Sequence, residues 1–364
     1  MAKNNTKKIT IADVANEAGV SSATVSLVLN KKSQSGISKA TSDRVMQTAV
    51  KLGYLQSTDI NTSSQNLEIA VMLPDLINPC FSRFLSQVSD YAYNSNVHLD
   101  FCSTGGSPEV EREYLLRMIE RGVSGILYVY SPSCEDFLKR NIRKIPTVIV
   151  GDCAQRSFLA NISTDNYEAG HMLADYLFNL GHHHVAYITQ PVNAVSQLRS
   201  RRLLGLSEGF SSHGCADTFH VFEQIDMVPT SNGTAPEVLI GQNKTEEILR
   251  SHPEVTAIVT MGDMIAIGVY NILHREGIKI PDDISVASFD DIEFARYISP
   301  SLTTVDARLQ LRCKFAFDYL MQIINEGPDD TSEPLFVSYR STLRERKSTG
   351  PARNGKLPFL SFLD

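Results

Sequence analysis

The sequence has few of the features that mark membrane or secreted proteins. It contains no apolar stretch approaching the roughly 18 residues that a membrane helix needs. The opening residues, MAKNNTKKIT, include no apolar run, so we expect neither a secretion signal nor a membrane anchor. These two absences predict a cytoplasmic protein without a membrane partner.

Motifs for cofactors, metals and disulfides are also scarce. The chain has six cysteines but no CxxC pair, which favours reduced, mostly buried thiols and implies neither zinc nor disulfides. It has no GxGxxG and no GxxxxGKS/T sequence, the phosphate-binding loops of dehydrogenases and nucleotide hydrolases. We therefore expect no cofactor and no enzymatic activity.

Acidic residues prevail over basic ones, but the charge is unevenly distributed. The formal net charge of the whole chain is -7. Residues 1–55 hold 8 basic and 3 acidic residues, a net charge of +5, whereas the remaining 309 residues hold 26 basic and 38 acidic ones, a net charge of -12. A basic segment on an acidic body is expected of a tethered phosphate-binding module. The alternative interpretation is a solvated basic face without a function.

Within that basic segment, residues 11–30 read IADVANEAGVSSATVSLVLN and predict two short helices joined by a tight turn. Apolar residues recur at helical spacing from Ile11 to Ala18, Gly19 interrupts them, and Ser21 stands where an N-cap would open a second helix. This pattern is typical of a helix-turn-helix, whose second helix enters the major groove of DNA. Double-stranded DNA is therefore the expected partner.

A third helix is predicted for residues 38–52, where Val45, Ala49 and Leu52 share one face. Residues 1–55 would then form an all-α helix-turn-helix headpiece. The stretch that follows has Ile60 as its only apolar residue before Leu67 and cannot contribute a core. We therefore predict a linker or hinge over residues 56–67.

From residue 68 onward, short β-branched runs alternate with longer amphipathic stretches, which is typical of an α/β fold with parallel sheets. The predicted strands cover residues 69–73, 97–102, 125–130, 147–151, 184–189, 256–261 and 284–289. Two such series in one chain predict two similar lobes with a cleft between them. Ligands of open α/β sheets bind beyond the carboxyl ends of the strands, so the loops there are where a site is expected.

Seven motifs along the chain match one known family. They are ITIADVANEAGVSSATVSLVLN (9–30), LPDLINPCF (73–81), GVSGILY (122–128), STDNYEAGHMLADYLFNLGH (163–182), GDMIAIGV (262–269), PDDISVASFDDIEFA (281–295) and PSLTTV (300–305). On these motifs the sequence resembles the lactose and galactose repressor (LacI/GalR) family of bacterial transcription regulators. The resemblance implies a homodimer with an operator-binding headpiece. It also implies a two-lobed, periplasmic-binding-protein-like body (68–346) that binds a small, sugar-like effector. Residues 347–364 remain as a predicted flexible tail.

The second helix of the headpiece offers candidate base contacts at Ser22 and Ala23, with Leu27 one turn further along. Family members often carry arginine at that last place, which reads guanine, whereas leucine offers only an apolar contact such as one to a thymine methyl. We therefore expect an operator that departs from the arginine-reading consensus. Packing inside the headpiece is an equal alternative for Leu27.

Phosphate contacts are expected from hydroxyl and amide side chains near the helix ends, because such groups commonly fix the register of a protein on the DNA backbone. The candidates are Thr10, Ser21, Thr24, Ser26 and Asn30. The alternative for Ser21 is that it caps the helix and makes no contact with DNA.

In the resembling family the linker forms a short helix on the operator, and a leucine from each subunit wedges into the minor groove and kinks the DNA. The linker of this chain is shorter and lacks that leucine. Ile60 is the only candidate wedge, and an ordinary linker residue is the alternative. We expect a weaker kink than in the family.

By matching positions, the resemblance places seven side chains around the effector cleft: Asp75, Asn78, Phe81 and Asp152 from the first lobe, and Arg202, Asp263 and Asp290 from the second. Carboxylates and an arginine fork satisfy sugar hydroxyls, and an aromatic ring covers an apolar face of the sugar.

Alternatives remain within the cleft. Arg199 or Arg201 could take the place of Arg202, and one carboxylate of Asp290 and Asp291 could cap the next helix. The family usually has alanine, asparagine and aspartate where this chain has Met261–Asp263. One typical sugar contact is therefore missing, which leaves the class of ligand open.

Three consecutive histidines, His182–His184, suggest a metal site at first sight. Consecutive residues near the start of a strand point in different directions, and no second group of ligands stands nearby in the sequence. We therefore expect a turn there and no metal.

Together these observations predict a sequence-specific DNA-binding transcription regulator, expected to be a repressor controlled by a small effector. One alternative is a ligand-independent repressor with a vestigial cleft. A solute-binding protein is a weaker alternative, because it would need a secretion signal.

Overall fold

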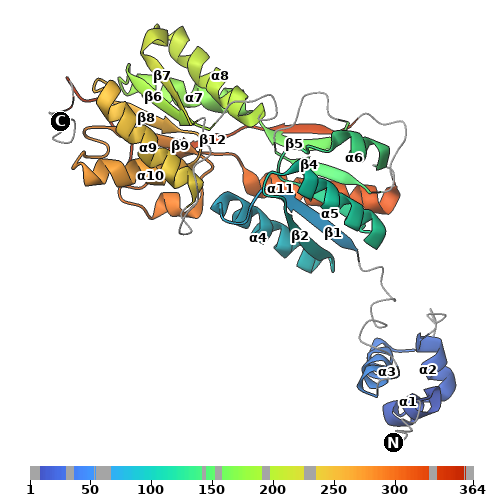
Figure 1. The fold of residues 1–364 in the computed structure, drawn as a ribbon. Helices are drawn as coiled ribbons and strands as arrows, with labels where there is room; N and C mark the ends of the chain where they lie inside the picture. The colour runs from blue at the N-terminus through green and yellow to red at the C-terminus, as the bar shows by residue number, and fades with distance from the viewer. Residues whose placement is uncertain are drawn as a thin grey trace, which may run out of the picture. The chain divides into compact units, whose positions relative to one another are not determined.

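The structure is a computed structural model that describes the chain except for residues 1–8, 30–36, 53, 55–66, 142–144, 152–157, 191–196, 225–234, 328–333, 356 and 358–364. The chain forms two compact units, Met1–Leu67 and Glu68–Asp364 (Figure 1). Three predicted site residues, Asn30, Ile60 and Asp152, lie outside the described residues, as does nearly all of the predicted linker.

Three helices build the headpiece: α1 (Ile11–Ala18), α2 (Ser22–Leu29) and α3 (Lys39–Lys51). Gly19 ends α1 at φ 64°, a left-handed conformation that glycine adopts without a steric penalty, and the chain turns there toward α2. The predicted helix-turn-helix is thus present. Its hydrophobic core joins all three helices and contains Val14, Ala15, Ala18, Val25, Val45 and Ala49.

The first lobe of the body is a parallel six-stranded sheet in the order β11-β5-β4-β3-β1-β2. Its strands are β1 (Glu68–Leu73), β2 (His98–Ser103), β3 (Gly125–Tyr128), β4 (Thr147–Val150), β5 (Ala160–Thr164) and β11 (Phe336–Tyr339). One face packs against α5 (Pro108–Arg121) and α6 (Glu135–Asn141), and α11 (Leu309–Glu326) covers the other beside α4 (Pro79–Asn94).

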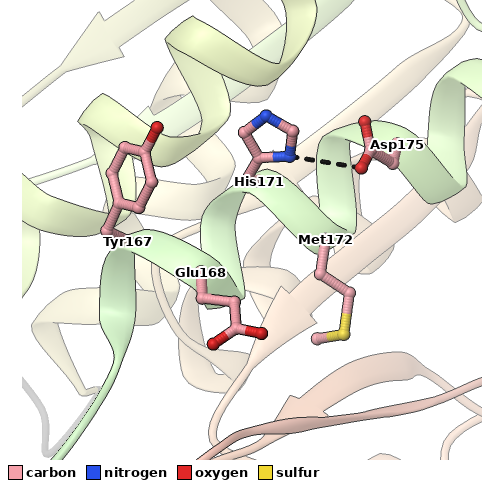
Figure 2. Close-up of a pocket in the computed structure, with 5 residues that line it drawn as sticks. All are labelled: Tyr167, Glu168, His171, Met172 and Asp175. Carbon is pink, nitrogen blue, oxygen red and sulfur yellow. Dashed lines mark hydrogen bonds and ion pairs between the residues drawn. The ribbon is translucent and has the colours of Figure 1, made fainter.

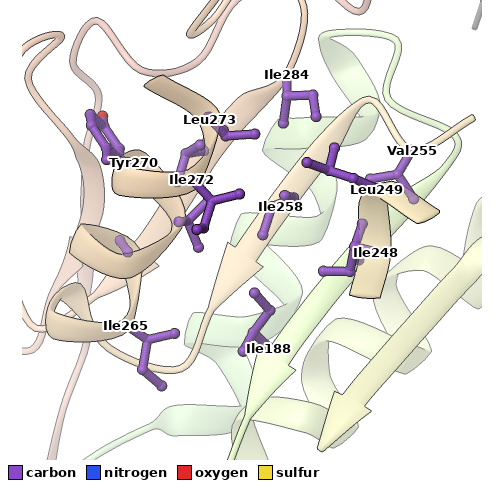
Figure 3. Close-up of a cluster of buried hydrophobic side chains, with 14 of the residues drawn as sticks. Ile188, Ile248, Leu249, Val255, Ile258, Ile265, Tyr270, Ile272, Leu273 and Ile284 are labelled. Atoms are coloured by element: carbon purple, nitrogen blue, oxygen red, sulfur yellow. The ribbon is translucent and has the colours of Figure 1, made fainter. Parts of the chain in front are cut away.

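The second lobe repeats this plan in the order β12-β10-β9-β8-β6-β7, where only β12 runs antiparallel to its neighbour. The strands are β6 (Val185–Thr189), β7 (Phe219–Glu223), β8 (Ala257–Thr260), β9 (Ser285–Phe289), β10 (Thr303–Asp306) and β12 (Thr342–Arg344). The helices are α7 (Asn166–Asn179), α8 (Gln197–Ser212), α9 (Pro236–Ser251) and α10 (Asp263–Arg275). Helices α7 and α8 cover one face, and α9 and α10 cover the other, where Figure 3 shows the buried cluster around Ile258 and Leu273. The predicted two-lobed α/β body is thus confirmed.

The chain passes between the two lobes three times, after β5, β10 and β11. These crossing segments are bonded to one another: Thr164 Oγ1 donates to the carbonyl of Ala307 at 3.1 Å, and the amide of Asp165 donates to the carbonyl of Tyr339 at 3.2 Å. The lobes are therefore joined by three neighbouring segments, each of which begins at the carboxyl end of a strand.

Helices α7 and α8 approach each other at backbone contact distance. A Cβ built on Gly205 would lie 2.1 Å from the carbonyl oxygen of Tyr167, and one on Gly170 would lie 2.4 Å from that of Arg202. The stretch GLSEG (205–209) matches the letters of a hydrolase GxSxG motif, but it lies inside α8 rather than on a strand-to-helix turn. Its glycines therefore serve helix packing.

Residues 347–355 do not form the flexible tail that the sequence predicts. The Ser348 side chain is fully buried, its hydroxyl donates to the carbonyl of Val286 at 2.6 Å, and it accepts from the amide of Thr303 at 2.7 Å. Arg353 donates to the carbonyls of Pro253 and Val255, each at 2.9 Å. The Pro and Gly residues correctly predict irregular backbone in this segment. Irregular backbone can nevertheless be packed and ordered when its polar groups are hydrogen-bonded.

None of the helices in the described part of the chain is both long enough and apolar enough to span a bilayer.

We expect Gly205→Ala to destabilise the body by about 3 kcal/mol, because the added methyl must force α7 and α8 apart. Urea unfolding followed by circular dichroism measures this change. Ser211→Ala, at an exposed position of the same helix, is the matched control and should stay within about 0.5 kcal/mol of the wild type. Equal stability of the two variants would contradict the close helix packing.

Candidate functional site

Helix α2 presents a small exposed face in the headpiece. Ser22, Ala23 and Leu27 are exposed, whereas Val25 on the opposite face is fully buried in the core. Leu27 is 44% exposed and lies outside the hydrophobic cluster of the headpiece. The alternative that Leu27 packs inside the headpiece is therefore wrong, and its side chain is available to a partner.

Two of the predicted phosphate contacts are helix caps. Thr10 and Asp13 form a capping box at the start of α1, in which the amide of Thr10 donates to Asp13 Oδ2 at 2.8 Å. Ser21 Oγ accepts the amide of Thr24 at 3.1 Å at the start of α2, which is the capping role given above as its alternative. Thr24 and Ser26 are half-buried on α2.

A cavity of about 610 Å³ lies between the two lobes of the body. Five predicted ligand residues line it: Asp75, Asn78, Phe81, Arg202 and Asp290. Its walls also contain Phe84, Tyr130, Met261, Met264 and Ile265. The cavity therefore combines apolar and aromatic surface with a few charged groups, a composition typical of small-molecule sites.

Of Arg201 and Arg202, it is Arg202 that lines the cavity, whereas the side chain of the other alternative, Arg199, lies outside the described residues. The Arg202 guanidinium is buried and donates to Asn166 Oδ1 at 2.8 Å, to the carbonyl of Met261 at 2.7 Å and to Asp290 Oδ1 at 3.3 Å. Arg201, by contrast, lies over the ring of Tyr167 and near Asp165, with its side chain 38% exposed. Arg202 therefore fixes the ends of β8 and β9 against α7.

Asp263 does not line the cavity, which corrects the prediction from the sequence. Its carboxylate is buried under α10, where Oδ1 accepts from Thr304 Oγ1 at 2.7 Å and Oδ2 accepts from the amide of Ile292 at 2.8 Å. Burial, and then the negative charge of Asp290, raise the pKa of Asp263 to about 8. Asp263 therefore anchors the segment after β9, and burial favours the protonated form of its carboxyl group.

Asp290 and Asp291 follow β9 in strained left-handed backbone, with φ of 108° and 49°. Asp290 lines the cavity. Asp291 turns into the lobe, where its Oδ1 accepts from Arg346 at 2.5 Å. Neither carboxylate caps the short 3₁₀ helix Glu293–Arg296, whose N-cap is Ile292 without a side-chain bond. The helix-cap alternative for this pair is therefore wrong.

Residues of α4 link the first lobe to the second across the cavity mouth. Asn78 caps α4 through Oδ1, which accepts the amide of Cys80 at 3.0 Å, and its Nδ2 donates to Glu237 Oε1 at 3.2 Å. Arg83 donates to the carbonyl of Asp291 at 2.6 Å. Both contacts join the lobes, so their rupture must accompany any opening of the cavity.

The first-lobe wall of the cavity is fixed by a buried carboxylate. Glu111, on α5, accepts from the amides of Ser133 and Cys134 at 3.0 to 3.2 Å and from the hydroxyl of Tyr130 at 3.0 Å. Ser133 and Tyr130 line the cavity. Glu111 is thus a positioning residue for this wall, which could not be recognised in the sequence because α5 carries several other glutamates.

Other lining residues were also missed by sequence reasoning. Tyr130 and Gln190 directly follow β3 and β6, so the rule that sites form beyond strand ends could have found them. Glu237 and Arg312 come from the first turns of α9 and α11. These two helices lie at the cavity because of the way the chain crosses between the lobes, which the sequence does not reveal.

A second, smaller hollow of about 340 Å³ lies on the outer surface of α7 (Figure 2). Its lining comes from that one helix and includes Tyr167, His171 and Asp175. Because no other element contributes a converging group to its lining, the cavity between the lobes is the better candidate for a ligand.

The histidine run agrees with the expected turn. His182 is buried, with Nδ1 2.9 Å from Thr256 Oγ1 and Nε2 3.0 Å from the carbonyl oxygen of Gly350. Burial lowers the pKa of His182 to about 4, which keeps it neutral. It therefore ties the start of β6 to the C-terminal segment.

Two family models match the chain. One, described as bacterial regulatory proteins of the lacI family, covers residues 10–57, and the other, a periplasmic binding protein-like domain, covers residues 174–349. The transcriptional repressor PurR of Vibrio vulnificus is 30% identical over 334 residues, which are 88% of this chain and 93% of that protein.

Solved structures share the fold. A LacI family transcriptional regulator from Enterococcus faecium with bound ribose is 25% identical with a TM-score of 0.67, covering 79% of this chain and 100% of that one. The lac repressor dimer bound to operator has a TM-score of 0.75 at 22% identity, covering 94% of this chain and 100% of that one.

The raised pKa of Asp263 predicts a pH-dependent stability. The pKa is about 8 in the folded state against an ordinary value of 3.8, so the folded state holds one more proton between these pH values. The contribution of Asp263 to stability is therefore lost as the pH rises through this window. Asp263→Asn imitates the protonated form and should flatten the dependence, which chemical unfolding between about pH 5 and about pH 8 measures. Exposed Asp282→Asn is the control, and equal slopes in both variants would argue against a neutral Asp263.

Proposed function

Because the chain belongs to the lacI family of bacterial regulatory proteins, we propose that it is a transcription regulator, most simply a repressor, that reads an operator in duplex DNA through α2. In this proposal a small polar effector binds between the lobes of the body and controls the affinity for DNA. The protein acts as a homodimer in the cytoplasm and carries out no catalysis.

One observation carries the DNA-binding half of the proposal. Helix α2 keeps Ser22, Ala23 and Leu27 exposed while Val25 anchors it in the core, so the same helix is held rigidly and has a free reading face. The net charge of +5 over residues 1–55 supplies the attraction to phosphates. We assign base contacts to this face and phosphate contacts to Thr24 and Ser26 beside it.

The remaining predicted DNA contacts divide into two groups. Thr10 and Ser21 act first as caps, in which the hydroxyl oxygen accepts a backbone amide. We propose that any phosphate contact they make uses the hydroxyl proton as the donor, which Thr10 gives to Asp13 Oδ2 in this structure. Asn30 and the wedge candidate Ile60 stay predictions, because they lie outside the described residues.

The effector half rests on the composition of the cavity. Arg202, Asp290 and Glu237 offer charged hydrogen-bonding groups around a volume of about 610 Å³, and Phe81 and Tyr130 supply aromatic surface. This combination suits a compact, hydroxyl-rich ligand with one apolar face. The bound ribose in the Enterococcus faecium regulator supports a sugar-like class. Such a ligand acts as a switch only if it prefers one arrangement of the lobes.

A ligand-independent repressor is the second candidate, and a specific observation favours it. The polar groups of the cavity already satisfy one another, since Arg202 bonds Asp290 and Asn78 bonds Glu237. A ligand must compete with these bonds, so its affinity depends on how much it gains beyond them.

We expect Leu27→Arg to change the operator sequence that the full-length protein selects from a pool of random duplexes. An arginine on the reading face can bind guanine bidentately, which is worth about 1–3 kcal/mol against the wrong base. Selection and sequencing should show a new guanine in each half-site and weaker binding to the wild-type sites. Gln47→Arg adds the same charge at an exposed position of α3 and serves as the control. If the wild type and Leu27→Arg select identical sequences, the proposal that α2 contacts the bases is contradicted.

We expect a thermal-shift screen of pentoses, hexoses, sugar phosphates and polyols to find a compound that stabilises the wild type, because a ligand of the folded state alone raises its stability. Phe81→Ala should weaken the binding of that compound by about 1–2 kcal/mol, because the aromatic ring no longer covers the apolar face of the ligand. The control is Phe315→Ala on α11, which lies outside the cavity. If no compound of the panel changes the melting temperature of the wild type, the result favours the ligand-independent repressor.

A further inference from the structure

A group of metal-binding side chains lies at the outer edge of the second lobe, apart from the cavity. His220 is on β7, the edge strand of the sheet, His252 is the C-cap of α9, and Glu254 follows in the loop toward β8. Each side chain offers one ligand atom, and these atoms all lie within 4.8 Å of one another. All three residues are half-buried, so the group is partly shielded from water.

The local backbone holds these side chains in place. The amide of His252 donates to the carbonyl of Ile248 at 2.8 Å, and the amide of Val255 donates to that of His252 at 3.0 Å. Arg353 bonds the carbonyls of Pro253 and Val255, on either side of Glu254. The loop that carries Glu254 is therefore anchored by the C-terminal segment.

The three side chains already interact with one another. His252 Nδ1 lies 3.0 Å from Glu254 Oε1, and the rings of His220 and His252 are stacked with centroids 4.0 Å apart. A proton thus links His252 and Glu254 at the place where two ligand atoms converge. A cation can take the place of this proton, as happens when metal sites load.

A further imidazole lies beside this group. His184 directly precedes β6, and its carbonyl accepts the amide of Thr256, two residues after Glu254, at 2.9 Å. Its Nδ1 is buried and has no hydrogen-bond partner within the part of the chain that the structure describes. A buried, unpaired nitrogen is unfavourable unless something binds it, so it is a second sign of a missing ligand.

We propose that His220, His252 and Glu254 bind a divalent transition-metal ion. Two imidazoles with one carboxylate form a donor set that suits Zn²⁺ better than Mg²⁺ or Ca²⁺, which prefer oxygen ligands. The ion would tie the edge strand β7 to the end of α9, so its expected effect is on the stability of the second lobe.

The test is titration of the full-length protein with ZnCl₂ by isothermal calorimetry at neutral pH, with the melting temperature measured in parallel. We expect one ion per chain and a higher melting temperature with zinc. His220→Ala/His252→Ala should weaken binding by at least roughly tenfold, since even outer partners of metal ligands change affinity by that much. The control is His98→Ala/His274→Ala, which removes two exposed imidazoles elsewhere and should bind as the wild type does.

Glu254→Gln guards against a folding defect in the double variant, because glutamine keeps the size and the hydrogen bond to His252 but loses the charge. It should keep the zinc-free melting temperature of the wild type and lose the zinc-induced shift. The proposal is overturned if zinc binds the wild type no more tightly than the double variant, or if Glu254→Gln retains the full shift.

Discussion

The buried guanidinium of Arg202 is the contact on which the second lobe's side of the cavity depends. It bonds Asn166 at the start of α7 and the backbone after β8, and it reaches Asp290 after β9 while lying 4.5 Å from the ring centroid of Phe289. A buried charge is tolerable only when its donors are satisfied, so these partners hold one another in place. The glycine contacts between α7 and α8 set the depth of Arg202, because its own carbonyl lies against Gly170.

In the first lobe a buried acidic side chain, Glu111, has the role that Arg202 has in the second lobe. Glu111 gathers two backbone amides and the hydroxyl of Tyr130, and so shapes the segment after β3 that lines the cavity. Each lobe is thus rigid around one satisfied buried charge. Apart from the bonds between the crossing segments, the described residues join the lobes through Asn78 and Arg83, whose hydrogen bonds are only partly buried. Motion of the body is therefore expected at the crossing segments rather than inside either lobe.

The headpiece was readable from local signals. Gly19 ends α1 and Ser21 caps α2, as the sequence predicts. The capping box of Thr10 and Asp13 was not predicted, although it also acts within a few residues. In the body, the buried strands with short apolar runs, such as β1 and β3, were also predictable. The strands β5, β7, β10, β11 and β12 were missed. They are short or partly exposed, and their pairing depends on partners distant in the sequence.

The sequence by itself determined the family, the helix-turn-helix and the two α/β series, because local periodicity, caps and turn residues act over short separations. It also placed Asp75, Asn78, Phe81, Arg202 and Asp290 at the cavity by resemblance. Only the tertiary structure decided that Asp263 turns inward to Thr304 and that residues 347–355 are packed. It alone joined His220 to His252 and Glu254. The physical reason is that burial and long-range hydrogen bonds depend on which elements meet, and those meetings arise from the three crossings between the lobes and from sheet order.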